Sequence, residues 1–92
     1  MDIDYSALES EIETGVLRHR LAEELASGFR DLRKQGEPLP PASYFATKVA
    51  EIINSGAEEP LSEAMKYGLY LEVLTACEEA RATVLGEPAP SQ

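Results

Sequence analysis

The sequence predicts an all-α fold, a compact bundle of three or four helices joined by short connections that contain proline and glycine. Two observations lead to this prediction. Alanine, leucine, glutamate and arginine, which favour helices, dominate the chain of 92 residues. Apolar residues recur three or four positions apart, and no useful length of the chain alternates as a strand would. We therefore expect one helical domain over residues 1–85 and a disordered C-terminal tail over residues 86–92, GEPAPSQ.

The N-terminal part of the chain contains two apolar stripes that are out of phase. Ser6 and Glu9 have the spacing of a capping box, which predicts a helix start. The first stripe then comprises Leu8, Ile12 and Val16, and the second, turned by more than about 90°, comprises Leu17, Leu21, Leu25, Phe29 and Leu32. Either a short helix ends near Gly15, or one long helix contacts different neighbours at its two ends. We favour the break, because glycine often follows a helix end.

A proline-rich segment, QGEPLPPASYF (residues 35–45), separates the second helix from the third. Basic residues precede it and Gly36 lies within it, and both are typical of a helix end. Pro38–Pro41 matches the minimal PxxP pattern of a polyproline ligand, but no lysine or arginine follows before Lys48. Prolines also stop one helix and start the next, where no amide donor is needed. We interpret the segment as a connector.

Two further helices are expected after these prolines. The first starts at Pro40–Pro41 and stops at Asn54–Gly56, and its apolar stripe comprises Phe45, Val49, Ile52 and Ile53. The second starts at Pro60, behind two glutamates that favour the positive end of the helix dipole. Its apolar stripe comprises Leu61, Met65, Leu69, Val73, Ala76 and Ala80.

The last helix also carries a second apolar face, formed by Tyr67, Tyr70, Leu71 and Leu74. A helix that is apolar on more than one side is either central in its bundle or buried against another chain. A domain of this size has little room to bury both faces. We therefore expect these four residues to form an interface with another chain, and the alternative is that they belong to the core.

The chain is strongly acidic, with 17 acidic residues, 8 basic residues and a formal net charge of −9. Direct binding of nucleic acid requires clustered lysine and arginine, so we expect none. An acidic protein instead attracts basic partners. The residues expected to form an acidic partner-binding surface are Glu58, Glu59, Glu63, Glu72, Glu78 and Glu79.

The main basic segment follows Gly15 and comprises Arg18, His19, Arg20, Arg30, Arg33 and Lys34. We expect these residues to pair with acids of this chain or of a dimer partner, such as Asp2, Asp4, Glu9 and Glu11. His19 lies four positions before Glu23, so the two side chains should meet on one helix face as a surface pair.

Residue types that support catalysis or metal binding are scarce. His19 and Cys77 are the only histidine and the only cysteine, so the chain cannot form an intramolecular disulfide. The sequence contains no paired-cysteine or paired-histidine motif, no Glu-x-x-His and no glycine-rich phosphate loop. We therefore expect a protein that is not an enzyme and has no catalytic residue, no metal and no cofactor. Cys77 should be a reduced thiol in the core.

Neither an export signal nor an apolar run long enough to span a membrane is evident, so we expect a cytoplasmic protein without membrane contact. These observations favour a small acidic module for protein–protein interaction, of the adaptor, chaperone or inhibitor type. We expect it to form a homodimer and to bind a protein partner with a basic surface. The alternative is an acidic mimic of nucleic acid that inhibits a DNA- or RNA-handling protein.

Overall fold

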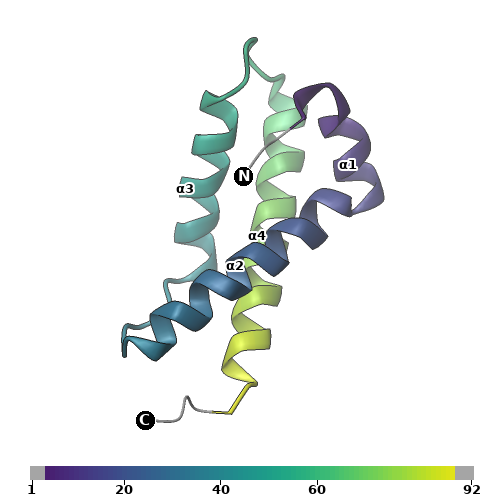
Figure 1. Ribbon diagram of the computed structural model, residues 1–92. Helices are drawn as coiled ribbons and strands as arrows, with labels where there is room; N and C mark the ends of the chain where they lie inside the picture. Colours follow the sequence, from purple (N-terminus) through teal and green to yellow (C-terminus); the bar gives the residue numbers. More distant parts are fainter. Residues whose placement is uncertain (1–3, 89–92) are drawn as a thin grey trace.

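The computed structural model describes residues 4–88 and confirms the predicted all-α bundle (Figure 1). No strand occurs among the described residues, and proline or glycine lies in each connection between the helices, as predicted. In chain order, the elements are a 3₁₀ turn η1 (Tyr5–Ala7), α1 (Leu8–Thr14), α2 (Val16–Lys34), α3 (Ala42–Ser55) and α4 (Glu63–Leu85).

The central helix of the bundle is α4. It contacts α1, α2 and α3; α2 crosses it at a steep angle, whereas α3 runs alongside it (Figure 1). Phe29 of α2 and Phe45 of α3 meet edge to face, with ring centroids 5.4 Å apart. Both hydrophobic clusters of the core include residues of α4. The buried residues of this helix are Leu69, Val73, Ala76, Cys77, Ala80 and Val84.

The structure shows that Gly15 breaks the first helix. Its φ of 79° lies in the left-handed region, which a residue with a Cβ enters at a cost of about 1–2 kcal/mol. The Gly15 amide donates to the carbonyl of Ile12 (3.3 Å) and closes α1. Arg20 Nη1 then donates to Glu11 Oε1 (3.1 Å) and joins α2 to α1 across the bend. The bend accounts for the change of phase between the two apolar stripes.

The capping box predicted at Ser6 does not form. The amide and the hydroxyl of Ser6 both donate to Oδ1 of Asp4, at 3.1 and 2.6 Å, and these hydrogen bonds lower the pKa of the Asp4 carboxyl. The first described element is therefore η1, and α1 starts only at Leu8. The prediction was wrong because the Asp4 carboxylate, a strong acceptor, lies just ahead of the serine and engages its hydroxyl.

Prolines precede the last two helices without lying inside them. α3 starts directly after Pro41, which occupies the cap position. α4 starts at Glu63 rather than at the predicted Pro60. The start is fixed by the side chain of Ser62, whose hydroxyl oxygen accepts a hydrogen bond from the Met65 amide (3.1 Å). The predicted stop of α3 at Asn54–Gly56 is confirmed.

The proline-rich segment connects α2 to α3, as the sequence predicts. At the end of α2, Gly36 has a φ of 78°, and the amides of Gly36 and Glu37 donate to the carbonyls of Arg33 (3.1 Å) and Leu32 (2.9 Å). This pattern is a Schellman motif, which satisfies carbonyls that the helix end leaves free. Leu39 is half-buried and packs against the core cluster formed by residues of α2 and α4.

The expected disordered tail, residues 86–92, is described only as far as residue 88, and residues 89–92 lie outside the described part. The carboxylate of Glu87 accepts two hydrogen bonds from Nε and one from Nη2 of Arg30, at 2.7–3.0 Å. The pairing holds the pKa of the Glu87 carboxyl below its usual range and raises the pKa of Arg30. Arg33 Nη1 also donates to the Glu87 carbonyl (2.9 Å). The start of the expected tail is thus tied to α2.

Replacing Gly15 and Gly28 with alanine should change stability in opposite directions. Gly15→Ala places a Cβ in the left-handed region and 3.2 Å from the Arg18 guanidinium, so we expect the free energy of unfolding to fall by about 1–2 kcal/mol. Gly28 lies inside α2 with no atom within 4 Å of the added Cβ, so Gly28→Ala should raise it by about 0.5–1 kcal/mol. Urea unfolding followed by circular dichroism measures both changes. Changes of the same sign would contradict an obligatory break at Gly15.

Candidate functional site

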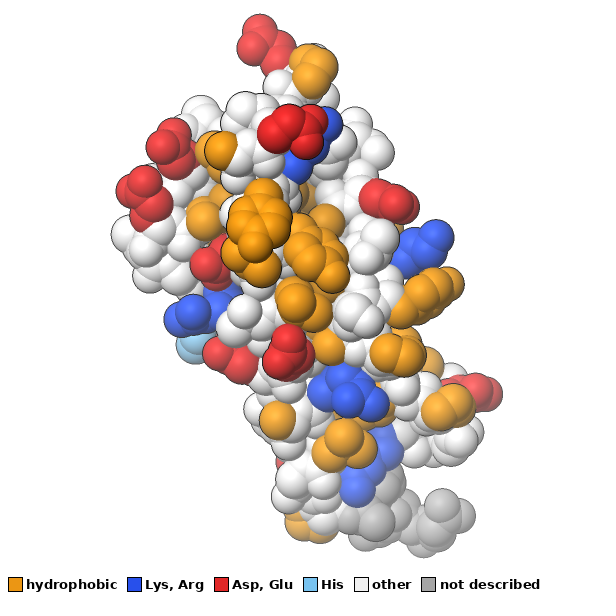
Figure 2. All heavy atoms as spheres, turned by 180° about the vertical axis from the view of Figure 1, so that it is seen from behind, with side chains coloured by type: hydrophobic (Ala, Val, Ile, Leu, Met, Phe, Trp, Pro, Cys, Tyr) orange, Lys and Arg blue, Asp and Glu red, His pale blue; other side chains and the backbone are white. Residues whose placement is uncertain are grey.

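The strongest candidate for a functional surface lies on the side of α4 that faces away from the core. We call Tyr67, Tyr70, Leu71 and Leu74 the α4 patch. Figure 2 shows hydrophobic side chains gathered over α4 on this side, with acidic side chains around them. Tyr67 is 66% exposed and Leu71 is 41% exposed. The two residues lie four positions apart, so they are neighbours on one helix face.

The structure divides the predicted interface into two halves. Tyr70 and Leu74 are half-buried and pack against the main core cluster, whereas Tyr67 and Leu71 remain exposed. Among residues 4–88, no element covers these two side chains, because α1, α2 and α3 occupy the other sides of α4. The second apolar face therefore belongs in part to the core, and for its exposed part an interface stays a prediction. α4 is central in the bundle, and it still presents apolar surface to the outside.

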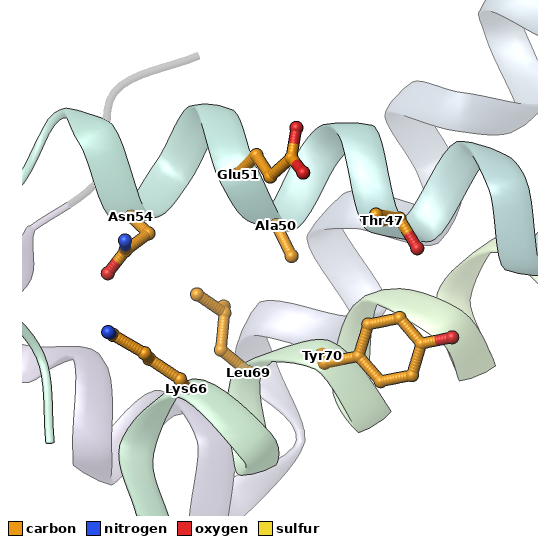
Figure 3. Close-up of a pocket in the computed structure, with 7 residues that line it drawn as sticks. All are labelled: Thr47, Ala50, Glu51, Asn54, Lys66, Leu69 and Tyr70. Carbon is orange, nitrogen blue, oxygen red and sulfur yellow. The ribbon is translucent and has the colours of Figure 1, made fainter. Parts of the chain in front are cut away.

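A shallow cavity of about 210 Å³ lies beside the patch, between α3 and α4 (Figure 3). Lys66 points toward Asn54 at one end, Tyr70 lies opposite Thr47 at the other, and Leu69 lies between them (Figure 3). The Oδ1 atom of Asn54 is buried and has no hydrogen-bond partner among the described residues. The cavity is thus a hollow between the two helices, directly beside Tyr70 of the patch.

A second apolar surface, which was not predicted from the sequence, lies between α2 and α3. We call it the α2–α3 groove; its volume is about 510 Å³, and Leu21, Leu25, Val49, Ile52 and Ile53 form most of its lining. Ile52 was expected in the core stripe of α3 but is 71% exposed, whereas Ile53 is buried. Adjacent residues of a helix point about 100° apart, and of these two isoleucines only Ile53 faces the core. Two consecutive isoleucines in one helix were therefore the feature of the sequence that could have indicated an exposed apolar residue here.

The six glutamates of the predicted acidic surface do not form one surface. Glu58 and Glu59 lie in the α3–α4 connection next to Glu63 at the start of α4, and these three form an acidic end. Glu79 lies about 160° around the helix from Glu63 and pairs with Arg18, at an N–O distance of 3.9 Å. Glu72 is half-buried, and Glu78 is exposed. The prediction grouped these glutamates by their position in the sequence and did not consider that they point to different sides of α4.

The basic segment pairs largely within the chain, as expected. Arg20 binds Glu11, Arg18 lies near Glu79, and Arg30 binds Glu87. His19 Nε2 lies 3.1 Å from Glu23 Oε1 on an exposed helix face, which confirms the predicted i,i+4 pair. The guanidinium of Arg33 donates to backbone carbonyls at the end of α4. These contacts engage most of the basic side chains of α2 within the chain, and exposed ion pairs of this kind each add little to stability.

Cys77 is fully buried in α4, as expected for a core thiol. Burial, assisted by the nearby carboxylate of Glu78, raises the pKa of the thiol to about 11. Among residues 4–88, histidine, cysteine and acidic side chains nowhere gather in a group of three that could hold a metal ion. Every helix of the described part is too short or too polar to cross a bilayer.

Comparisons with known proteins identify no relative of the chain. It matches no protein-family model, no curated protein sequence and no solved structure. Function therefore has to be inferred from the surfaces and charges of the described residues.

The buried thiol of Cys77 should make stability depend on pH above the usual thiol pKa. The folded state keeps the thiol neutral up to about pH 11, whereas the unfolded state ionises it near the ordinary thiol pKa of 9.0. The contribution of the neutral thiol to the free energy of unfolding is therefore fully present below pH 9 and is lost between pH 9 and 11. Urea unfolding of the parent and Cys77→Ala proteins at pH 8 to 10.5 measures this, and their difference in unfolding free energy should shrink above pH 9. A constant difference would contradict the buried neutral thiol.

Proposed function

We propose that the protein is a small acidic module for protein–protein interaction, which self-associates through the α4 patch and binds a basic protein partner through its acidic end. The observation that carries the proposal is the exposure of Tyr67 and Leu71 on the central helix. An apolar patch next to half-buried residues gains stability when a second surface removes it from water. Tyrosine is also enriched at interfaces, because it combines a large apolar ring with a polar hydroxyl.

The charge distribution suggests the chemistry of the other partner. Glu58, Glu59 and Glu63 lie together at one end of the molecule, and the net charge of the chain is −9. Such an end accelerates encounter with basic proteins, an effect that weakens as salt increases. A mimic of nucleic acid would need a longer row of carboxylates, whereas Glu72 and Glu79 lie on another side of α4. We therefore favour protein binding over mimicry.

The remaining features fit an interaction module without chemistry of its own. The single histidine, His19, is exposed and paired with Glu23, and the single cysteine is buried. A free reduced thiol fits a reducing compartment such as the cytoplasm, where we expect the protein to act.

Charged substitutions in the exposed half of the patch should abolish self-association and leave the fold intact. We expect the double variant Tyr67→Glu, Leu71→Glu to be monomeric, because it places two carboxylates in the proposed contact. Tyr70 and Leu74 are unsuitable positions, since their half-buried side chains also support the core. Light scattering after size exclusion, over a concentration series, measures the mass, and circular dichroism checks the fold.

Ile52→Glu is the matched control, because Ile52 is an equally exposed apolar residue in the α2–α3 groove. It should leave the mass unchanged. Unaltered association of the Tyr67→Glu, Leu71→Glu variant, or loss of association in the Ile52→Glu variant, would contradict the assignment of the α4 patch. A parent protein that stays monomeric at every concentration would contradict self-association itself.

A further inference from the structure

The exposed face of α4 carries charges of opposite sign toward its two ends. Glu63 lies at the start of the helix with 93% of its side chain exposed, and Arg81 lies one turn before the end. Between them, Tyr67, Leu71 and Leu74 form the apolar centre, and Glu78 lies beside them. The helical period places all six residues within roughly 80° of one another around the helix.

We propose that the α4 patch binds the α4 patch of a second copy with the two helices antiparallel, related by a two-fold axis that crosses the open face of α4 at the level of residues 72 and 73. This inference rests on the proposed self-association and adds its geometry. In the antiparallel arrangement, Glu63 faces Arg81 of the second copy, and Tyr67 faces Glu78. Leu71 and Leu74 face each other at the centre. All three pairs can form in a single alignment of the two helices. The position halfway between the two members of each pair along the sequence is residue 72 or lies just after it.

Charge decides between the antiparallel and the parallel pairing. A parallel pair would place Glu63 against Glu63, Glu78 against Glu78 and Arg81 against Arg81, and like charges that face each other are destabilising. The antiparallel pair replaces each of these contacts with an attractive one. The hydroxyl of Tyr67 could donate to the Glu78 carboxylate, a charge-assisted hydrogen bond of the stronger kind.

The side chains at the ends of this face are available for such contacts. Arg81 is half-buried and has no ion-pair partner within 4 Å among residues 4–88. Glu78 is exposed and forms no ion pair there either. Within residues 4–88, the ion pair of Glu63 is with Lys66, at 3.5 Å, on the surface of its own helix. A carboxylate of a second copy would give the Arg81 guanidinium an ion-pair partner.

Single cysteines along the same face distinguish the two pairings. Cys77 is retained, because it is fully buried, and the parent protein is the control. Near the two-fold axis, two copies of Leu71→Cys would lie about 4.5 Å apart along the helix axes, which allows a disulfide. Two copies of Ala64→Cys would be separated by roughly 25 Å and two copies of Ala82→Cys by roughly 28 Å. We therefore expect mild oxidation to cross-link Leu71→Cys alone, and to cross-link Ala64→Cys only when it is mixed with Ala82→Cys.

A charge exchange provides a second, independent measurement. Glu63→Lys and Arg81→Glu should each weaken the dimer, with an increase in Kd on the order of tenfold, because each replaces two attractive contacts by repulsive ones. The double variant should restore the parent Kd, since the exchanged charges again attract. Sedimentation equilibrium measures the Kd values, and circular dichroism confirms that each variant is folded.

The outcomes separate this inference from the proposed function on which it rests. Cross-linking of Ala64→Cys or Ala82→Cys by itself, no cross-linking of Leu71→Cys, or a double charge variant as weak as the single ones would overturn the antiparallel pairing. If the Tyr67→Glu, Leu71→Glu variant were still monomeric, self-association through the patch would stand. A monomeric parent protein would overturn both.

Discussion

The fold depends on the buried side of α4, which is the surface against which α1, α2 and α3 all pack. Small side chains allow this. Ala76, Cys77 and Ala80 are almost fully buried, so the crossing helix α2 can approach the backbone of α4 closely. In residues 4–88, three helices surround α4, and they cover the sides that carry the core residues. The opposite side of α4 remains open, and the exposed apolar residues there follow from the same arrangement.

The helices themselves could be predicted well from the sequence, because period and composition are local properties. The ends of helices were predicted unevenly. Gly15 and Gly36 mark ends where the chain needs a left-handed conformation, and both lie where expected. The starts were less predictable, because several nearby side chains compete as acceptors for the first amides. Ser6 donates to the carboxylate of Asp4 instead of forming the expected capping box. The hydroxyl of Ser62 fixes the start of α4 at Glu63, three residues after the predicted start at Pro60.

The candidate site could be predicted only in part, and the reason is again geometric. Periodicity identified the second apolar face of α4, but which of its residues are covered depends on where α3 lies beside the helix. α3 half-buries Tyr70 and Leu74 and leaves Tyr67 and Leu71 exposed. The same limit explains Ile52, which no pattern could distinguish from Ile53 without knowing the direction of the core. Pairing of charges between distant segments, such as Arg30 with Glu87, was likewise beyond local reasoning.

One helix thus supplies both the core and the candidate interface, and this couples association to stability. A partner that binds only the folded patch stabilises the fold by mass action, by about 2.7 kcal/mol at a concentration one hundred times its Kd. That is a large fraction of the stability of a small domain. The net charge of −9 acts in the opposite direction between two copies, because their overall fields repel. Moderate salt screens this long-range repulsion more than it screens close pairs within an interface. Self-association through the α4 patch should therefore tolerate salt, whereas encounter of the acidic end with a basic partner should not.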